Sequence, residues 1–162
     1  MAARAAQYDR YIARFGAVFL YRIAVRPNNM WGRYQRWVTG KDYEEAWRLS
    51  DGRIVKVDAI NGKIVEVKWT NAPSSAYSSS PYNPSHEFYN EEDLVDQLAR
   101  EMQLAREQGL PGVVVAVSNE AAQADFMNLI ETHFPEEYQS GFIKVWMVPV
   151  TGIPPVSAEP ER

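Results

Sequence analysis

Three charged residues lie close together in the stretch DGRIVKVDAINGKIVEVKWT, residues 51–70. Asp58 precedes an Asn-Gly turn, and Glu66 and Lys68 follow it on one face of a strand, because strand side chains alternate between faces. Two carboxylates that share a site repel each other unless a cation lies between them. Oxygen ligands suit Mg²⁺ or Mn²⁺, and a lysine beside such a cation could hold a water molecule or stabilise a phosphate. A solvated hairpin with a surface Glu-Lys pair has the same pattern, so both interpretations stay open.

The turn decides whether the two carboxylates share a face. A two-residue loop would pair Asp58 with Val65 and put the carboxylates on opposite faces of the hairpin. A three-residue loop, residues 60–62, would pair Asp58 with Ile64, so that Glu66 becomes its diagonal neighbour on the same face. Chemistry at this hairpin therefore requires a loop of odd length, and we predict one.

The elements that must position these residues follow from the pattern of apolar residues, caps and breakers. We expect helices at 3–15, 30–40, 90–109 and 119–134, and strands at 43–50, 53–59, 63–70, 111–119 and 141–150. A meander followed by crossover helices predicts an α/β fold with a mixed central sheet flanked by helices. We treat 1–150 as one domain with a basic helical N-terminal part at 1–42 and a long loop at 71–90, followed by a disordered tail at 151–162.

The composition limits the classes of function. The chain has 162 residues, which is typical of one domain, and an apolar content of 46% that is sufficient for a core. It has no cysteine, which excludes disulfides, thiol nucleophiles and zinc sites with cysteine ligands. Its longest apolar runs, GAVFLY and GVVVAV, are too short to span a bilayer, so we expect no membrane partner.

Positive charge gathers near the N-terminus. Residues 1–42 hold eight Lys or Arg against two Asp, although the whole chain has a net charge of −4. Such a segment could neutralise phosphates of a nucleic acid, and it could equally be a solvated helix face. The residues that we expect to bind phosphates are Arg4, Arg10, Arg14, Arg33 and Arg36.

The charged hairpin resembles a known catalytic motif. Asp58 followed by EVK at residues 66–68, on a hairpin that precedes a helix and a strand, is similar to the PD-(D/E)xK nuclease superfamily. More narrowly, RYQRWVTG ahead of the strand with Asp58, and then IVEVKW, resembles the restriction-endonuclease-fold toxin domains of bacterial polymorphic toxins. The likeness covers residues 34–148, and it departs from the motif at Val57, where the family has Pro.

The resemblance implies roles for particular residues. Asp58 and Glu66, with the backbone carbonyl of Val67, would bind Mg²⁺ or Mn²⁺, and Lys68 would position or activate the attacking water. Many members add a glutamine on the helix after the motif, and here the best match is Gln97 and the second Gln103. Glu44 or Glu45 could supply a further carboxylate upstream. The Tyr34-Gln35 and Thr39-Gly40 pairs could brace their helix against the sheet.

The resemblance also implies a biological role. It predicts a metal-dependent endonuclease that cleaves DNA in preference to RNA. Such a domain is the toxin part of a larger bacterial protein that is secreted or injected and acts in the cytoplasm of the target cell. It travels with a cognate immunity protein. The alternative is a catalytically silent module that binds nucleic acid or protein on the same fold.

Overall fold

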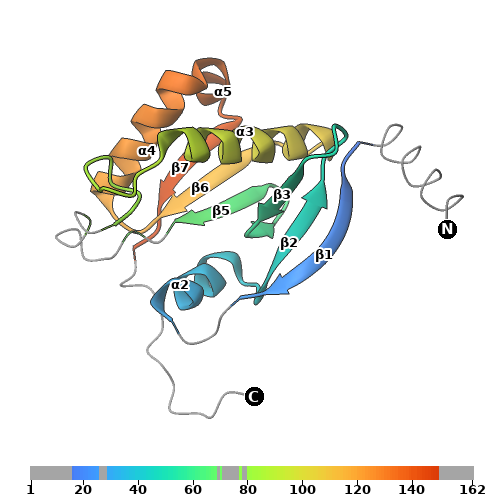
Figure 1. The fold of residues 1–162 in the computed structure, drawn as a ribbon, viewed down its shortest axis with the longest axis horizontal. Helices are drawn as coiled ribbons and strands as arrows, with labels where there is room; N and C mark the ends of the chain where they lie inside the picture. The colour runs from blue at the N-terminus through green and yellow to red at the C-terminus, as the bar shows by residue number, and fades with distance from the viewer. Residues whose placement is uncertain (1–15, 26–28, 69, 71–76, 78–79, 150–162) are drawn as a thin grey trace, which may run out of the picture.

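The computed structural model describes residues 16–25, 29–68, 70, 77 and 80–149 (Figure 1). The elements in these ranges are, in chain order, β1 (Val18–Ala24), α2 (Met30–Thr39), β2 (Tyr43–Arg48), β3 (Ile54–Val57), β4 (Ala59–Ile60), β5 (Ile64–Lys68), α3 (Glu91–Glu107), β6 (Val113–Val117), α4 (Glu120–His133), α5 (Pro135–Ser140) and β7 (Ile143–Met147). None of the helices within these ranges is long and apolar enough to cross a membrane. The chain is a mixed α/β protein, as the sequence predicts.

The strands form two sheets within the described part of the chain. β1, β2 and β3 make an antiparallel sheet in that order, and β4, β5, β6 and β7 make a mixed sheet in which β5, β6 and β7 run parallel. The chain passes from the first sheet to the second at Asp58, between β3 and β4. The expected strand at 53–59 is therefore divided, and its two parts pair with different neighbours.

Helices lie on both sides of the mixed sheet. α3 and α4 lie on one side and α2 lies across the sheet from them (Figure 1). All five residues of β6 are buried, as a continuous apolar run predicts for a strand that is covered on both faces. The expected apolar stripe of α3 is also confirmed, since its residues are buried in the core: Leu94, Leu98, Met102 and Ala105.

The short helix α2 is fixed at several points. The Asn29 side chain caps its start by accepting from the Gly32 N–H at 2.8 Å. Gly40 ends it in the left-handed conformation, at φ 71°, as the sequence predicts.

Hydrogen bonds also connect α2 to the rest of the fold. The Tyr34 hydroxyl donates to the Val148 carbonyl at 2.7 Å, which ties α2 to the segment after β7. The Thr39 hydroxyl donates to the Gln35 carbonyl at 2.8 Å. The Tyr34 bond supports the expectation of a brace, whereas the Thr39 hydroxyl bond lies within the helix. The Thr39 carbonyl instead accepts from the Asn61 side chain, in the turn between β4 and β5, at 2.9 Å.

The N-terminal part differs from the expectation. Residues 18–24 form β1, which pairs with β2, so the helical assignment for 1–42 is wrong over this strand. Its β-branched and aromatic residues favour a strand, and β2 offers an edge on which it can pair. The helix expected at 3–15 and the tail at 151–162 lie outside the described residues. Of the long loop at 71–90, the structure describes residue 77 and a run of turns from 80.

The turn between β4 and β5 has an odd length, as predicted, but not the predicted register. Ile60 pairs with Ile64, so the loop is residues 61–63 rather than 60–62. Continuing that register places Asp58 opposite Glu66 instead of Ile64. Because the side-chain period of a strand is two residues, this shift leaves both carboxylates on the same face.

Candidate active site

Asp58 lies where β3 and β4 separate, and its side chain replaces a missing strand partner. The Ile64 N–H donates to the Gly112 carbonyl, so alternate residues of β5 face β6 and Val67 faces the other way. On the side of β5 that faces away from β6, β3 pairs with β2 and not with Val67. The Val67 N–H donates to Asp58 Oδ2 instead, at 2.6 Å. In a strand the N–H and C=O of one residue point the same way, so the Val67 carbonyl also faces the side of Asp58.

Glu66 and Lys68 lie buried on a central strand, where charged residues are rare. Glu66 is 3% exposed and Lys68 is 7% exposed, and Lys68 Nζ lies 3.0 Å from Glu66 Oε1. Gln97 of α3 bonds to both residues. Its Nε2 donates to Glu66 Oε1 at 2.8 Å, and its Oε1 accepts from Lys68 Nζ at 3.0 Å. The surface-pair interpretation of this Glu-Lys pair is therefore wrong.

Of the two candidate glutamines, the structure brings Gln97 to the charged cluster. Gln103 lies two turns further along α3 and contacts other residues, accepting from Arg53 at 2.6 Å and donating to Glu107 at 3.0 Å. Helical spacing explains the difference, because positions six residues apart on a helix do not share a face.

A third buried carboxylate, Glu101, lies beside the pair and was missed in the sequence. It lies four residues after Gln97 on the same face of α3, and Gln97 Nε2 lies 3.5 Å from Glu101 Oε1. Its side chain is fully buried, and its Oε2 has no hydrogen-bond partner among the described residues. Sequence spacing from Gln97 is the signal that could have identified it.

Burial and mutual repulsion shift the charges of this cluster. Burial, and then the charge of Glu66, raise the pKa of Asp58 well above its usual range, although the Val67 N–H and Lys68 oppose the shift. The same two causes raise the pKa of Glu101. Burial alone would lower the pKa of Lys68, but the charge of Glu66 and the other acidic groups outweigh it and raise that pKa. Lys68 is therefore held as a cation among carboxylates.

Gln35 of α2 is a second residue that the sequence did not assign to the site. Its buried side-chain amide, Nε2, donates to Asp58 Oδ1 and to Glu44 Oε1, both at 3.1 Å. Of the two upstream candidates, Glu44 lines the pocket beside Asp58 and Glu45 does not, so a role for Glu44 in the site stays a prediction. Gln35 connects the position of α2 to the orientation of Asp58.

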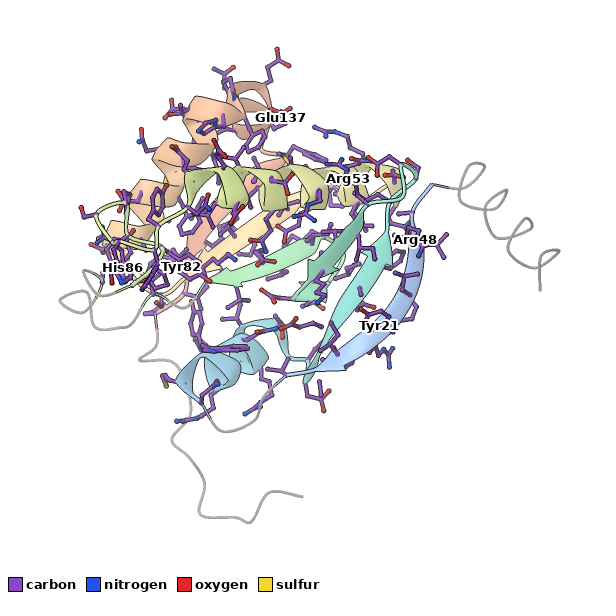
Figure 2. The ribbon with its side chains drawn as sticks, in the orientation of Figure 1. Tyr21, Arg48, Arg53, Tyr82, His86 and Glu137 are labelled. Atoms are coloured by element: carbon purple, nitrogen blue, oxygen red, sulfur yellow. The ribbon has the colours of Figure 1, made fainter. Side chains whose placement is uncertain are left out.

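These groups meet at a pocket of 460 Å³. Side chains of α2 form one wall, and β5 with the segment after it forms another. The lining residues include Trp31, Asp58, Glu66, Lys68 and Tyr82. Figure 2 shows Tyr82 at the end of β5 where Lys68 lies. A pocket at the carboxyl end of a parallel strand is where α/β proteins commonly bind ligands.

The oxygens around the pocket suit a hard divalent cation. Glu66 Oε2 is buried without a hydrogen-bond partner among the described residues. Within the described part of the chain each Asp58 oxygen accepts one hydrogen bond, which leaves its second lone pair for a ligand, and the Val67 carbonyl faces the same side. Carboxylate and carbonyl oxygens are the ligands of Mg²⁺ and Mn²⁺. No group of three or more His, Cys, Asp and Glu side chains in the described ranges is arranged to hold a metal ion.

The structure describes only two of the arginines that we expect to bind phosphates. Arg4, Arg10 and Arg14 lie outside the described residues. Arg33 and Arg36 lie half-buried on α2, and neither lines the pocket. A role of this cluster in binding phosphates therefore stays a prediction.

The buried carboxylates predict an unusual dependence of stability on pH. The pKa of Glu101 is higher in the folded protein than in the unfolded chain, so unfolding releases a proton between the two values, and the free energy of unfolding falls as the pH rises through that range. Lys68 does not offset this loss of stability. Its raised pKa changes the free energy of unfolding only at pH values above the ordinary pKa of lysine. In EDTA, the melting temperature of Glu101→Gln should rise relative to that of the parent as the pH rises above the ordinary pKa of glutamate. A difference that stays constant with pH would contradict the assignment.

The pocket thus brings together Asp58, Glu66 and Lys68, which the sequence proposed together, and adds Gln35 to them. Gln97 does not line the pocket and bonds to Glu66 and Lys68 from α3. These residues come from α2, the β3–β4 junction, β5 and α3, so their meeting depends on the fold as a whole. Comparisons of the chain with protein-family models, with curated proteins and with solved structures found no match.

Proposed function

We propose that this chain is a metal-dependent endonuclease of the PD-(D/E)xK type with a restriction-endonuclease-like core, and that it hydrolyses phosphodiesters of DNA in preference to RNA. One observation supports the proposal above all others. Glu66 and Lys68 lie buried and bonded on a central strand, and Asp58 lines the same pocket. Burying several charges is costly, and strongly shifted pKa values of the kind found here gather at functional sites.

The proposed ligands of one Mg²⁺ or Mn²⁺ are Asp58, Glu66 and the Val67 carbonyl. When bound, the cation supplies a Lewis acid for the phosphoryl oxygen and lowers the pKa of a water. Lys68 carries a fixed positive charge at the pocket and can orient the attacking water or stabilise charge on the phosphate. Gln97 holds Lys68 and Glu66 in place by one bond to each. Gln35 orients Asp58 from the opposite wall.

The biological context is proposed from the resemblance of the motif. The chain would be the toxin or effector part of a larger bacterial protein that is secreted or injected and acts in the cytoplasm of the target cell. A cognate immunity protein would be its partner, and the arginines of the N-terminal part would contact nucleic-acid phosphates, with an affinity that falls steeply with salt.

A substrate panel tests the activity. The purified protein is incubated with supercoiled plasmid, linear duplex DNA, single-stranded DNA and RNA, each with Mg²⁺, Mn²⁺ or EDTA. We expect cleavage with either metal and none with EDTA, and faster cleavage of DNA than of RNA. If no substrate is cleaved with any metal while the protein still binds nucleic acid, the chain is a binding module and the proposed activity is wrong.

A further inference from the structure

The pocket that holds the carboxylates also has an aromatic ring on each of two walls, Trp31 on the side of α2 and Tyr82 on the side of the segment after β5. The proposed chemistry leaves both rings unexplained. Trp31 of α2 lines the pocket and is 41% exposed. Its indole takes part in no hydrogen bond or ring contact with the rest of the described chain, whereas the Trp37 ring in the same helix contacts the Tyr34 ring. Exposing an indole to water is unfavourable by the hydrophobic effect, so a ring that is left open beside a reactive cluster is a candidate for ligand contact.

Tyr82 is the second ring of the pocket, and unlike Trp31 it is held firmly. Its ring contacts Phe126 of α4 at a centroid distance of 6.1 Å, and its N–H donates to the Ser80 hydroxyl at 3.2 Å. The Tyr77 hydroxyl lies 3.3 Å from the Tyr82 carbonyl and 2.7 Å from Asp125 Oδ2, which anchors this part of the loop to α4. Tyr82 is therefore a fixed platform in a segment of turns.

Both rings line the pocket that holds the groups that would act on a phosphate. Lys68 Nζ lies 5.0 Å from the centroid of the Tyr82 ring, so the ring and the cation border the same space. In a nucleotide, a single sugar separates the base from its phosphate. A base that contacts these rings would thus bring its own phosphate to the part of the pocket where Lys68 and Glu66 lie. A volume of 460 Å³ is in the range of pockets that enclose a small organic ligand.

We propose that Trp31 and Tyr82 receive an unstacked base, so that the substrate of this site is single-stranded nucleic acid or a strand with a base turned out of the helix. The inference rests on the proposed nuclease function and adds the form of the substrate to it. In a regular duplex both faces of each base are covered by its neighbours, and no base can lie against an aromatic side chain. In a single strand the bases are free to stack on such rings, and the stacking tolerates any sequence.

Binding in EDTA tests this form of the substrate without any cleavage. The probes are a fluorescein-labelled single-stranded 20-nucleotide DNA of mixed sequence and the blunt duplex of the same sequence, titrated at one salt concentration. We expect the parent to bind the single strand more tightly than the duplex. Trp31→Ala should weaken single-strand binding about tenfold, Trp31→Phe should largely restore it, and neither change should alter duplex binding, since base–aromatic stacking is sequence-tolerant and specific to exposed bases.

Trp146→Ala is the matched control, because Trp146 is also an exposed tryptophan but lines a different part of the surface. It should leave both affinities unchanged, and the melting temperature of each variant shows that it is folded. Unchanged single-strand affinity in folded Trp31→Ala, or a parent that prefers the duplex, overturns the inference. Metal-dependent cleavage of duplex DNA that is intact in Trp31→Ala would leave the nuclease proposal standing while this inference fails. If Trp31→Ala weakens single-strand binding but the parent cleaves nothing in any metal, the nuclease proposal fails and the binding of an unstacked base stands.

Discussion

Replacing Glu66 with glutamine should lower the rate of metal-dependent cleavage by at least about 100-fold while leaving the protein folded. Loss of residues that only support metal ligands commonly costs about 10–100-fold, and Glu66 is proposed as a ligand itself. Glutamine keeps the shape and the oxygen that can accept from Lys68 and Gln97. The removed charge no longer attracts Lys68, but it also no longer repels Asp58 and Glu101, so these effects oppose each other.

The measurement is the single-turnover cleavage rate of parent and variant in Mg²⁺, together with their melting temperatures in EDTA. Glu92→Gln is the control, since it makes the same chemical change at an exposed position of α3. The control should cleave at the parental rate, and the melting temperature of Glu66→Gln should move by only a few degrees. Full activity in Glu66→Gln would end the nuclease-site hypothesis, whatever the fold.

Lys68→Met should have the largest effect on stability. The change keeps much of the volume of the side chain but leaves Glu66 buried without its cation, beside the carboxylates of Asp58 and Glu101. Breaking a buried ion pair from one side costs about 3–5 kcal/mol. In a chain of this size that corresponds to a fall in melting temperature of about 10 °C. Cleavage should be lost as well, because the charge that faces the water or phosphate is absent.

A double-mutant cycle separates two causes of the lower stability of Lys68→Met: the loss of the ion pair with Glu66 and the disturbed packing of the core. Lys68→Met with Glu66→Gln removes both charges, so it should be more stable than Lys68→Met alone. Lys56→Met is the control at an exposed position of β3, and it should change the melting temperature little. A melting temperature of Lys68→Met equal to that of the parent would show that the Glu66–Lys68 contact does not stabilise this protein.

Much of the second half of the fold is predictable, because its periodicity is strong. The continuous apolar run of β6 and the helical stripe of α3 each indicate one structure, and both are confirmed. The helix α5 was missed, because none of its six residues, Pro135–Ser140, is fully buried and they show no apolar period.

The first half was harder, because its strands depend on distant partners. β1 was missed since its apolar and aromatic residues also suit a buried helix segment, and pairing with β2 decides between them. The division of the strand at Asp58 has no local signal: Ile54–Val57 alternates as a strand should, and only the competition between β2 and β5 for pairing separates it from β4.

The candidate site shows the same limit. The motif at Asp58, Glu66 and Lys68 was visible in the sequence through its resemblance to a known catalytic motif, although a surface pair has the same spacing. The contacts that surround it were not, since Gln35 reaches Asp58 across 23 residues and Gln97 reaches Glu66 across 31. Long-range hydrogen bonds of this kind depend on how α2 and α3 pack on the sheet, and that packing cannot be predicted from a single sequence.

The central claim is that one pocket of this protein cleaves nucleic acid with a divalent metal, and Asp58 tests it most directly. Asp58→Asn removes a proposed ligand charge at the pocket, and Asp51→Asn makes the same change in the exposed turn between β2 and β3, outside the pocket. The cleavage rate of both variants is measured beside the parent in Mg²⁺, on the substrate that the panel identifies. We predict that Asp51→Asn cleaves like the parent and that Asp58→Asn is slower by at least about 100-fold. Equal cleavage by folded Asp58→Asn and the parent would contradict the claim.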